Sequence, residues 1–163
     1  MDNIKIDILK NHPKAIPTLS KIWHEVLGKI WMPEVGIDEV ESLFYEELNR
    51  DMPLTFVALD GEIPVGSCTL HSTDDVRPDF GPWIESLVVD AAHQNKGIGK
   101  MLLDFTVAKA RELGFKSIYL FAFDPSLTQY YSRFGWEEIG VENFKSHQVR
   151  LMTLGLLMTT AGL

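Results

Sequence analysis

Two closely spaced glycines, Gly97 and Gly99, mark the stretch of the sequence best suited to bind an anion. They follow an apolar segment and open a segment whose apolar residues have helical spacing. The first turn of a helix carries unpaired N–H groups and the positive end of the helix dipole, so it accepts phosphate. Glycine also lacks the Cβ atom that would hold a phosphate away from the backbone. Lys96, Lys100 and His93 add positive charge, and the pattern predicts an anion site, although an ordinary strand-to-helix turn uses the same glycines.

Two widespread phosphate-binding patterns do not fit this stretch. A Walker A loop requires Gly where Gln94 stands and Ser or Thr where Met101 stands. A dinucleotide fingerprint requires a third Gly or Ala near the position of Leu102. The sequence therefore disfavours a nucleotide-binding module of either class and leaves open both another anion and an ordinary strand-to-helix turn.

Glu85 is the carboxylate best placed for acid–base chemistry. It stands among apolar residues in a segment with the composition of a central strand. Partial burial raises the pKa of a carboxyl group toward the range that is useful to a general base. The alternative is a surface glutamate, or an ion-pair partner, on an alternating strand.

The composition excludes several classes of protein. With 163 residues, 45% of them hydrophobic, the chain suits one domain with a substantial core. A formal net charge of −8 disfavours nucleic-acid binding and favours a cationic partner, although acidic proteins are also common for solubility alone. No segment has the features of a signal peptide or a membrane span, and no cluster of side chains has metal-ligand spacing. The single cysteine, Cys68, predicts a free thiol in a reducing, cytoplasmic setting.

The elements that position these residues follow from the apolar periodicity. Alternating or continuous apolar runs predict strands at 4–9, 54–59, 63–70, 83–89, 117–123, 136–139 and 148–154. Helical spacing predicts helices at 17–27, 38–48, 98–113 and 125–134. This order predicts an α/β (α+β) single domain with a mixed sheet, spanning residues 1–163.

Local signals predict where these elements begin and end. We expect Gly28 to end the first helix, Asp38 to be the N-cap of the second, and Asp124 to cap the last. Asp60 and Gly61 predict the turn of a hairpin. The apolar stripe predicted for the helix at 98–113 consists of Ile98, Met101, Leu102, Phe105 and Ala108.

Two segments resemble the signature motifs of the GNAT superfamily of acetyltransferases. Gln94, Gly97 and Gly99, after an apolar strand, match the Q/R-x-x-G-x-G/A motif, whose amides hold the diphosphate of acetyl-CoA in that superfamily. Residues 130–136 resemble its F-Y-E-K-x-G-F segment, also at the expected place after a strand. The resemblance is clearest over residues 53–136. It implies an acetyl-CoA-dependent N-acetyltransferase with a mixed, mostly antiparallel central sheet flanked by helices.

The resemblance also assigns roles to individual residues. It implies that Tyr131 protonates the departing CoA thiolate, because a phenol with an ordinary pKa of about 10 stays protonated at neutral pH. The alternatives are that Tyr130 is the acid, although we expect it to be the core residue of the two, or that both rings only pack. Glu85 would draw the proton from the amine. The cofactor-binding residues implied are the main chain of Leu87, Val88 and Val89, the loop residues Gln94, Asn95, Lys96, Gly97, Ile98, Gly99 and Lys100, and Asp124.

Asp124 departs from the pattern of the superfamily. The superfamily often has Asn at this position, seven residues before the tyrosine, where it helps to hold the cofactor. Asp can still cap the helix, but a carboxylate is a poorer neighbour for an anionic cofactor.

The acceptor pocket of this fold is usually built from the loop between the first two helices and the segment before the central strand. The candidates are Trp31, Met32, Glu34, Asp74, Asp75 and Asp79. Aromatic and acidic groups suit an ammonium-bearing acceptor, either a small amine or a peptide. The alternatives are a catalytically silent CoA-binding or sensing domain, and an interaction protein whose tail at 151–163 pairs strands across a homodimer.

Overall fold

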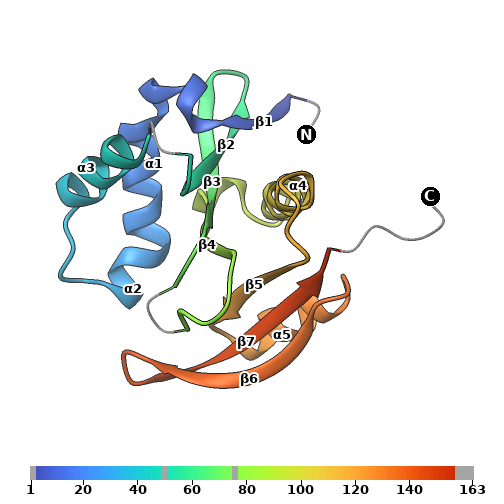
Figure 1. The fold of residues 1–163 in the computed structure, drawn as a ribbon. Coiled ribbons are helices and arrows are strands. Elements are labelled where there is room, and N and C mark those ends of the chain that lie inside the picture. Colours follow the sequence, from blue (N-terminus) through green and yellow to red (C-terminus); the bar gives the residue numbers. More distant parts are fainter. Residues whose placement is uncertain (1–2, 49–50, 75–76, 157–163) are drawn as a thin grey trace. The chain divides into compact units, whose positions relative to one another are not determined.

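The computed structural model describes residues 3–48, 51–74 and 77–156 (Figure 1). These residues divide into two compact units. The first comprises Met1–Leu70 and Glu85–Thr106, and the second comprises His71–Ile84 and Val107–Leu163. The chain passes from one unit to the other at the end of β3 (Ile63–His71), within β4 (Trp83–Val89) and within α4 (Ile98–Glu112).

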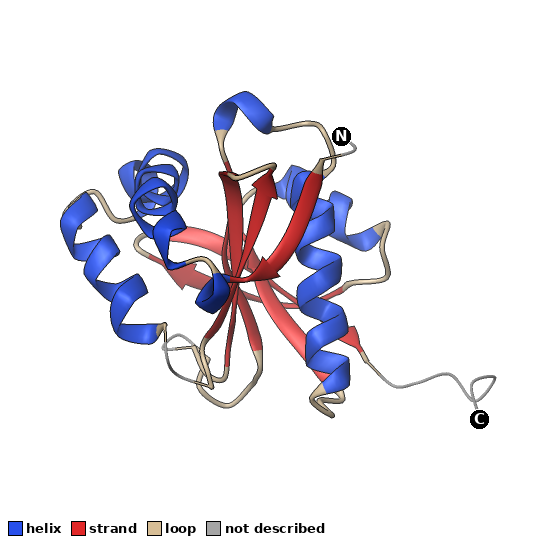
Figure 2. Ribbon diagram, turned by 90° about the horizontal axis from the view of Figure 1, so that it is seen from above, coloured by secondary structure: helices blue, strands red, loops and turns tan. Residues whose placement is uncertain are grey.

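The first unit combines an antiparallel hairpin with the first helices of the chain (Figures 1 and 2). Strand β1 pairs with β2, and β2 pairs with β3, both antiparallel. Helix α3 packs against α1. The elements besides β4 and α4 are β1 (Ile4–Ile8), the 3-10 turns η1 (Leu9–Asn11), η2 (Pro13–Ala15) and η4 (Ala91–His93), α1 (Ile16–Trp23), the π-helical turn η3 (His24–Gly28), α2 (Lys29–Trp31), α3 (Ile37–Glu47), β2 (Leu54–Asp60) and β3 (Ile63–His71).

The core of the first unit lies between its helices and the sheet. Apolar side chains repeat along α1 so that one face of the helix is buried. That face packs on alternate residues of β2 and on Val88 of β4. The cluster consists of Leu9, Ala15, Ile16, Leu19, Ile22, Val57, Leu59 and Val88, with Trp23, Val26, Leu27, Phe44 and Leu48 packed against it.

Three predicted boundaries in this unit are wrong. Gly28 does not end the first helix, because it keeps right-handed helical angles (φ −59°, ψ −46°) and the helical path runs through η3 into α2. Helix α3 begins at Ile37, so Gly36 is the N-cap and Asp38 lies inside the first turn. A carboxylate in the first turn interacts favourably with the positive end of the helix dipole. The hairpin turn lies one residue later than predicted, since Asp60 still pairs with Ile63.

The second unit contains a three-stranded antiparallel arrangement joined to the start of β4. Strand β5 pairs with β7, and β7 pairs with β6, both antiparallel, whereas β4 pairs with β5 in parallel at Trp83 and Tyr119. Lys145 and Ser146 form the β6–β7 turn with φ of 49° and 69°, so β6 runs well beyond the predicted 136–139. The elements besides β4 are β5 (Ser117–Ala122), α5 (Pro125–Ser132), β6 (Glu137–Phe144) and β7 (His147–Gly155).

Helix α4 occupies the predicted position but buries a different stripe. Met101 and Phe105 are 37% and 39% exposed, and Ala108 is also exposed. Apolar residues cover more than one side of this helix, so periodicity alone allowed two overlapping stripes. The buried residues are Ile98, Leu102, Leu103, Thr106, Val107 and Ala110.

The strand order is β1-β2-β3-β4-β5-β7-β6 in a sheet of seven strands. Parallel pairing at β4–β5 with antiparallel pairing in the other described ladders confirms the predicted mixed, mostly antiparallel sheet flanked by helices. The predicted extent of the domain, residues 1–163, stays a prediction. Within the described ranges, no helix is both long and apolar enough to cross a membrane.

Candidate active site

The predicted anion site is an exposed loop, residues 94–97, together with the first residues of α4, and we call residues 94–100 the anion loop. Its backbone turns through two left-handed residues, Asn95 (φ 63°) and Gly97 (φ 86°). The Gln94 side chain donates a hydrogen bond from Nε2 to the carbonyl oxygen of Val89, at 3.0 Å. The amide of Met101 donates to the carbonyl of Gly97, at 3.0 Å, which closes the first helical turn. The loop is thereby held at the end of β4, with the N-terminus of α4 beside it.

The two glycines of the anion loop, Gly97 and Gly99, differ in backbone conformation. Gly97 has a left-handed backbone, which strains any residue with a side chain. Gly99 does not, and a Cβ atom there would lie 3.8 Å from Val89 Cγ2, an ordinary contact. Neither conformation nor crowding within the protein requires glycine at Gly99, although Ala would favour the helix. The backbone at Gly99 is therefore open to a close approach, and the loop has room for a diphosphate.

The positive charges predicted for the anion loop are largely balanced by acids in the same unit. Lys100 Nζ lies 2.6 Å from both carboxylate oxygens of Asp104. His93 lies 3.0 Å from a carboxylate oxygen of Asp90 and 3.8 Å from one of Asp60. Lys96 is exposed. An anion bound at this loop would therefore depend on backbone amides and the helix dipole more than the sequence indicated.

Strand β4 carries an interruption at Ser86, which has φ of 54° between extended neighbours. Such a conformation costs a residue other than glycine about 1–3 kcal/mol. Glu85, directly before it, is half-buried, as are Leu87 and Val89, while Val88 is buried. The strand thus presents the predicted base and the predicted cofactor-binding main chain on either side of a kink.

Sequence reasoning missed the residue that lets β3 approach β4. A Cβ atom on Gly66 would lie 2.6 Å from the carbonyl oxygen of Val88, which is too close for any side chain. The amide of Asp90 also donates to the carbonyl of Val65, at 2.8 Å. An isolated glycine inside a strand pattern is the one sequence signal that could have indicated this approach.

The predicted general acid lies in the second unit, on α5. Tyr131 is 8% exposed and packs against Trp136, with ring centroids 5.9 Å apart. Tyr130 is half-buried, so the expectation that Tyr130 is the core residue of the pair is wrong. Helical geometry turns neighbouring residues to different faces, and the buried face of α5 carries Tyr131.

Asp124 caps α5 as predicted. Its Oδ1 accepts hydrogen bonds from the amide and the hydroxyl of Ser126, at 2.8 and 2.7 Å. These bonds, the hydroxyl's first, hold the pKa of the carboxyl group below its usual range. Asp124 is therefore an anion engaged in capping the helix, and a direct contact with an anionic cofactor remains a prediction.

The predicted acceptor residues are divided between the units. In the first unit, Trp31 is the last residue of α2, and Met32 and Glu34 lie in the connection to α3. In the second unit, Asp79 lies in the segment before β4. Asp74 precedes it in the same unit, and Asp75 lies outside the described residues. Their common role in binding an acceptor stays a prediction.

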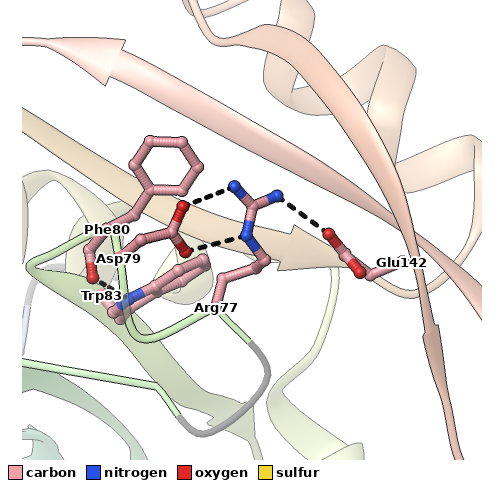
Figure 3. A network of polar contacts seen from close by, with 5 residues as sticks. All are labelled: Arg77, Asp79, Phe80, Trp83 and Glu142. Carbon is pink, nitrogen blue, oxygen red and sulfur yellow. Dashed lines mark hydrogen bonds and ion pairs between the residues drawn. The ribbon is translucent and has the colours of Figure 1, made fainter.

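Arg77 organises the segment before β4, and the sequence did not indicate it (Figure 3). Its guanidinium donates to both oxygens of Asp79, at 2.9 and 2.8 Å, and to Glu142 of β6, at 2.8 Å. It also lies 4.5 Å above the ring of Phe80. The indole of Trp83 donates to the carbonyl of Phe80, at 2.8 Å. A cationic acceptor at Asp79 would therefore compete with an internal guanidinium.

Replacing Arg77 by Gln should destabilise the protein in a pH-dependent way. The Arg77 guanidinium holds the pKa of Asp79 below its usual range. A lowered pKa contributes stability above about pH 4, the ordinary value, and this contribution is lost as pH falls through the value in the folded state. Urea unfolding should show a lower free energy of unfolding for Arg77→Gln than for wild type at pH 7. This difference in free energy should become smaller at pH 3. Glu142→Gln keeps Asp79 paired, so its difference in free energy of unfolding from wild type should change less between pH 7 and pH 3. An equal difference for Arg77→Gln at both pH values would contradict the assignment.

No group of three or more His, Cys, Asp or Glu side chains that could hold a metal ion occurs among residues 3–48, 51–74 and 77–156. The assignment of a site without a metal remains a prediction. The first unit contains the anion loop and the kinked part of β4 with the carboxylate of Glu85, and the second unit contains the buried Tyr131.

Comparisons with known proteins bear on the family and the fold of the chain. The sequence model of the acetyltransferase (GNAT) family matches residues 18–136. No curated protein sequence matches the chain. An aminoglycoside 6'-acetyltransferase type Ii structure is 21% identical with a TM-score of 0.74, over 95% of this chain and 99% of that one. An aminoglycoside 6'-N-acetyltransferase complexed with coenzyme A is 17% identical with a TM-score of 0.75, over 95% and 98%.

A chimeric spermidine N-acetyltransferase from Vibrio cholerae and hSSAT is 18% identical with a TM-score of 0.75, over 94% of this chain and 96% of that one. At such identities, the structural likeness establishes the fold and not the substrate. The family match covers more than half of the chain and includes the anion loop, β4 and Tyr131. The chain belongs to the GNAT family of acetyltransferases.

Proposed function

We propose that this protein transfers an acetyl group from acetyl-CoA to a primary amine of a small molecule or peptide, by direct attack of the amine on the thioester. The observation that carries the proposal is the anion loop, where Gly99 leaves the backbone open in the first turn of α4, directly after β4 and η4. The coenzyme A complex of the aminoglycoside 6'-N-acetyltransferase supports the same ligand. Bound acetyl-CoA would supply an activated acyl group as a thioester.

Each group of residues has its own role in the proposed reaction. The amides of the anion loop bind the diphosphate, aided by the dipole of α4. The main chain of Leu87, Val88 and Val89 aligns the cofactor arm and polarises the acetyl carbonyl. Glu85 accepts the proton of the ammonium group, through water where needed, and Tyr131 donates a proton to the leaving sulfur. These roles extend the family resemblance to this chain residue by residue.

The nature of the acceptor and the setting are part of the same proposal. The net charge of −8 favours an amine over nucleic acid, and the structurally similar proteins include acetyltransferases of spermidine and aminoglycosides. The free thiol of Cys68 supports a reducing, cytoplasmic setting.

In a homodimer, residues 151–153 could not pair with a second chain, because β5 and β6 flank them on both sides. Residues 157–163 of the tail lie outside the described residues.

The experiment that tests the proposal is a panel of amines assayed for thiol release from acetyl-CoA. The panel should include polyamines, aminoglycosides, amino acids and peptide N-termini. Turnover of at least one amine, with acetylation of its nitrogen verified by mass spectrometry, is the expected result. Tight binding of CoA without turnover of any amine would favour the silent sensing domain instead.

The thiol of this protein should not interfere with that assay. Burial raises the pKa of the Cys68 thiol to about 12, and thiolates are the reactive form. In native buffer near pH 8, Ellman's reagent should label less than about a tenth of Cys68 over the course of an assay, and all of it after denaturation in guanidinium. Stoichiometric labelling of the native protein would show that β3 opens readily.

A further inference from the structure

The interruption of β4 at Ser86 is attached to α1 by a side chain far away in the sequence. The indole Nε1 of Trp23 donates a hydrogen bond to Ser86 Oγ, at 3.1 Å. The two residues are 63 positions apart, and both lie in the first unit. The partner of this bond is the one residue of β4 in a left-handed conformation. A hydrogen bond at that position fixes the kink where the strand would otherwise tend to straighten.

The helix that carries Trp23 is itself adapted to place the indole. Trp23 is the last residue of α1, directly before the π-helical turn η3, and wider turns of this kind are frequent at functional sites. Gly28, at the end of η3, lies under the indole, because a Cβ atom there would be 2.9 Å from Trp23 Cζ3. Gly28 has ordinary helical angles, so the indole, and not the backbone, requires glycine.

We infer that Trp23 is a positioning residue that holds the kink of β4 and thereby directs the backbone of residues 85–89 toward acetyl-CoA. The kink separates Glu85 from Leu87, the first residue of the cofactor-binding main chain. Val88 packs in the same apolar cluster as α1, so the helix and the strand share one core. The part of this inference that concerns acetyl-CoA rests on the proposed function, whereas the link between Trp23 and β4 does not.

The test compares Trp23→Phe with wild type in two measurements. Hydrogen exchange of the free protein should show the amides of residues 85–89 exchanging about three- to ten-fold faster in the variant, the range that the loss of one hydrogen bond corresponds to. The Kd for CoA should rise by a similar factor. Gly28→Ala should reproduce the faster exchange by displacing the indole, and it should have no further effect in a Trp23→Ala background.

A matched control separates positioning from general stability. Ser20, also on α1, is buried and donates a hydrogen bond to the carbonyl of Ile16, at 2.8 Å. Ser20→Ala should lower the melting temperature without speeding exchange selectively at residues 85–89. Equal exchange in Trp23→Phe and wild type, or the same selective change in Ser20→Ala, would overturn the inference. If wild-type protein binds no CoA, the proposed function fails, while the exchange result still decides whether Trp23 holds β4.

Discussion

Gly99→Glu should weaken CoA binding by about 100-fold or more, equivalent to about 2.7 kcal/mol, while the protein stays folded. A side chain at this position meets only an ordinary contact with Val89 inside the protein, so the fold tolerates it. The same side chain would occupy the space that the diphosphate needs, and its charge would repel the phosphates. Calorimetric titration with CoA and thermal melting of the same sample would measure both quantities.

Gly140→Glu is a matched control for that variant. Gly140 of β6 has no atom within 4 Å of an added Cβ, so a side chain is tolerated there as at Gly99, and its φ is outside the left-handed region. The same change of size and charge there should leave the Kd for CoA within about two-fold of wild type, because no ligand is expected at that position. An unchanged Kd in Gly99→Glu would remove the diphosphate from the anion loop.

Tyr131→Phe should lower kcat by about 100-fold or more, with little change in the Kd for CoA. The variant removes only the hydroxyl that would donate a proton to the leaving sulfur, and general acid catalysis contributes about 10²–10⁴-fold. The buried ring keeps its packing against Trp136, so folding should be preserved. Steady-state kinetics with the best amine of the panel, together with calorimetry, would separate turnover from binding.

Tyr130→Phe provides the matched control on the same helix. Its ring packs against those of Tyr131 and Phe134, with centroids 5.5 and 5.1 Å away, and its hydroxyl has no proposed role. Turnover near wild type is the expected result. If Tyr130→Phe loses turnover and Tyr131→Phe keeps it, the two assignments must be exchanged.

Features encoded locally in the sequence could be predicted. The mainly apolar composition of β4, the helical spacing of α4 and the cap at Asp124 all depend on neighbours within one element. These elements, in their order, were enough for the mixed sheet and for the motif that opens α4. The prediction that Gly28 ends the first helix was wrong because glycine there depends on a side-chain contact. The indole of Trp23, one helical turn earlier, requires glycine at this position, and the chain does not reverse there.

Features that depend on partners far away in the sequence could not be predicted. Arg77 and Glu142 are 65 positions apart, and Trp23 and Ser86 are 63 apart. The left-handed conformation of Ser86 has no signal in its residue type, because serine in an apolar strand is ordinary. The balance of Lys100 by Asp104 was visible as helical spacing, but its effect on the anion loop required the geometry.

The most direct test of this account is a calorimetric titration of the wild-type protein with CoA and with acetyl-CoA, repeated in the presence of ATP. We predict one site per chain with a micromolar Kd, about −8 kcal/mol, which ATP at similar concentrations does not displace. Absence of heat and of any shift in melting temperature at millimolar CoA would contradict the account, because the anion loop would then hold no diphosphate of this kind.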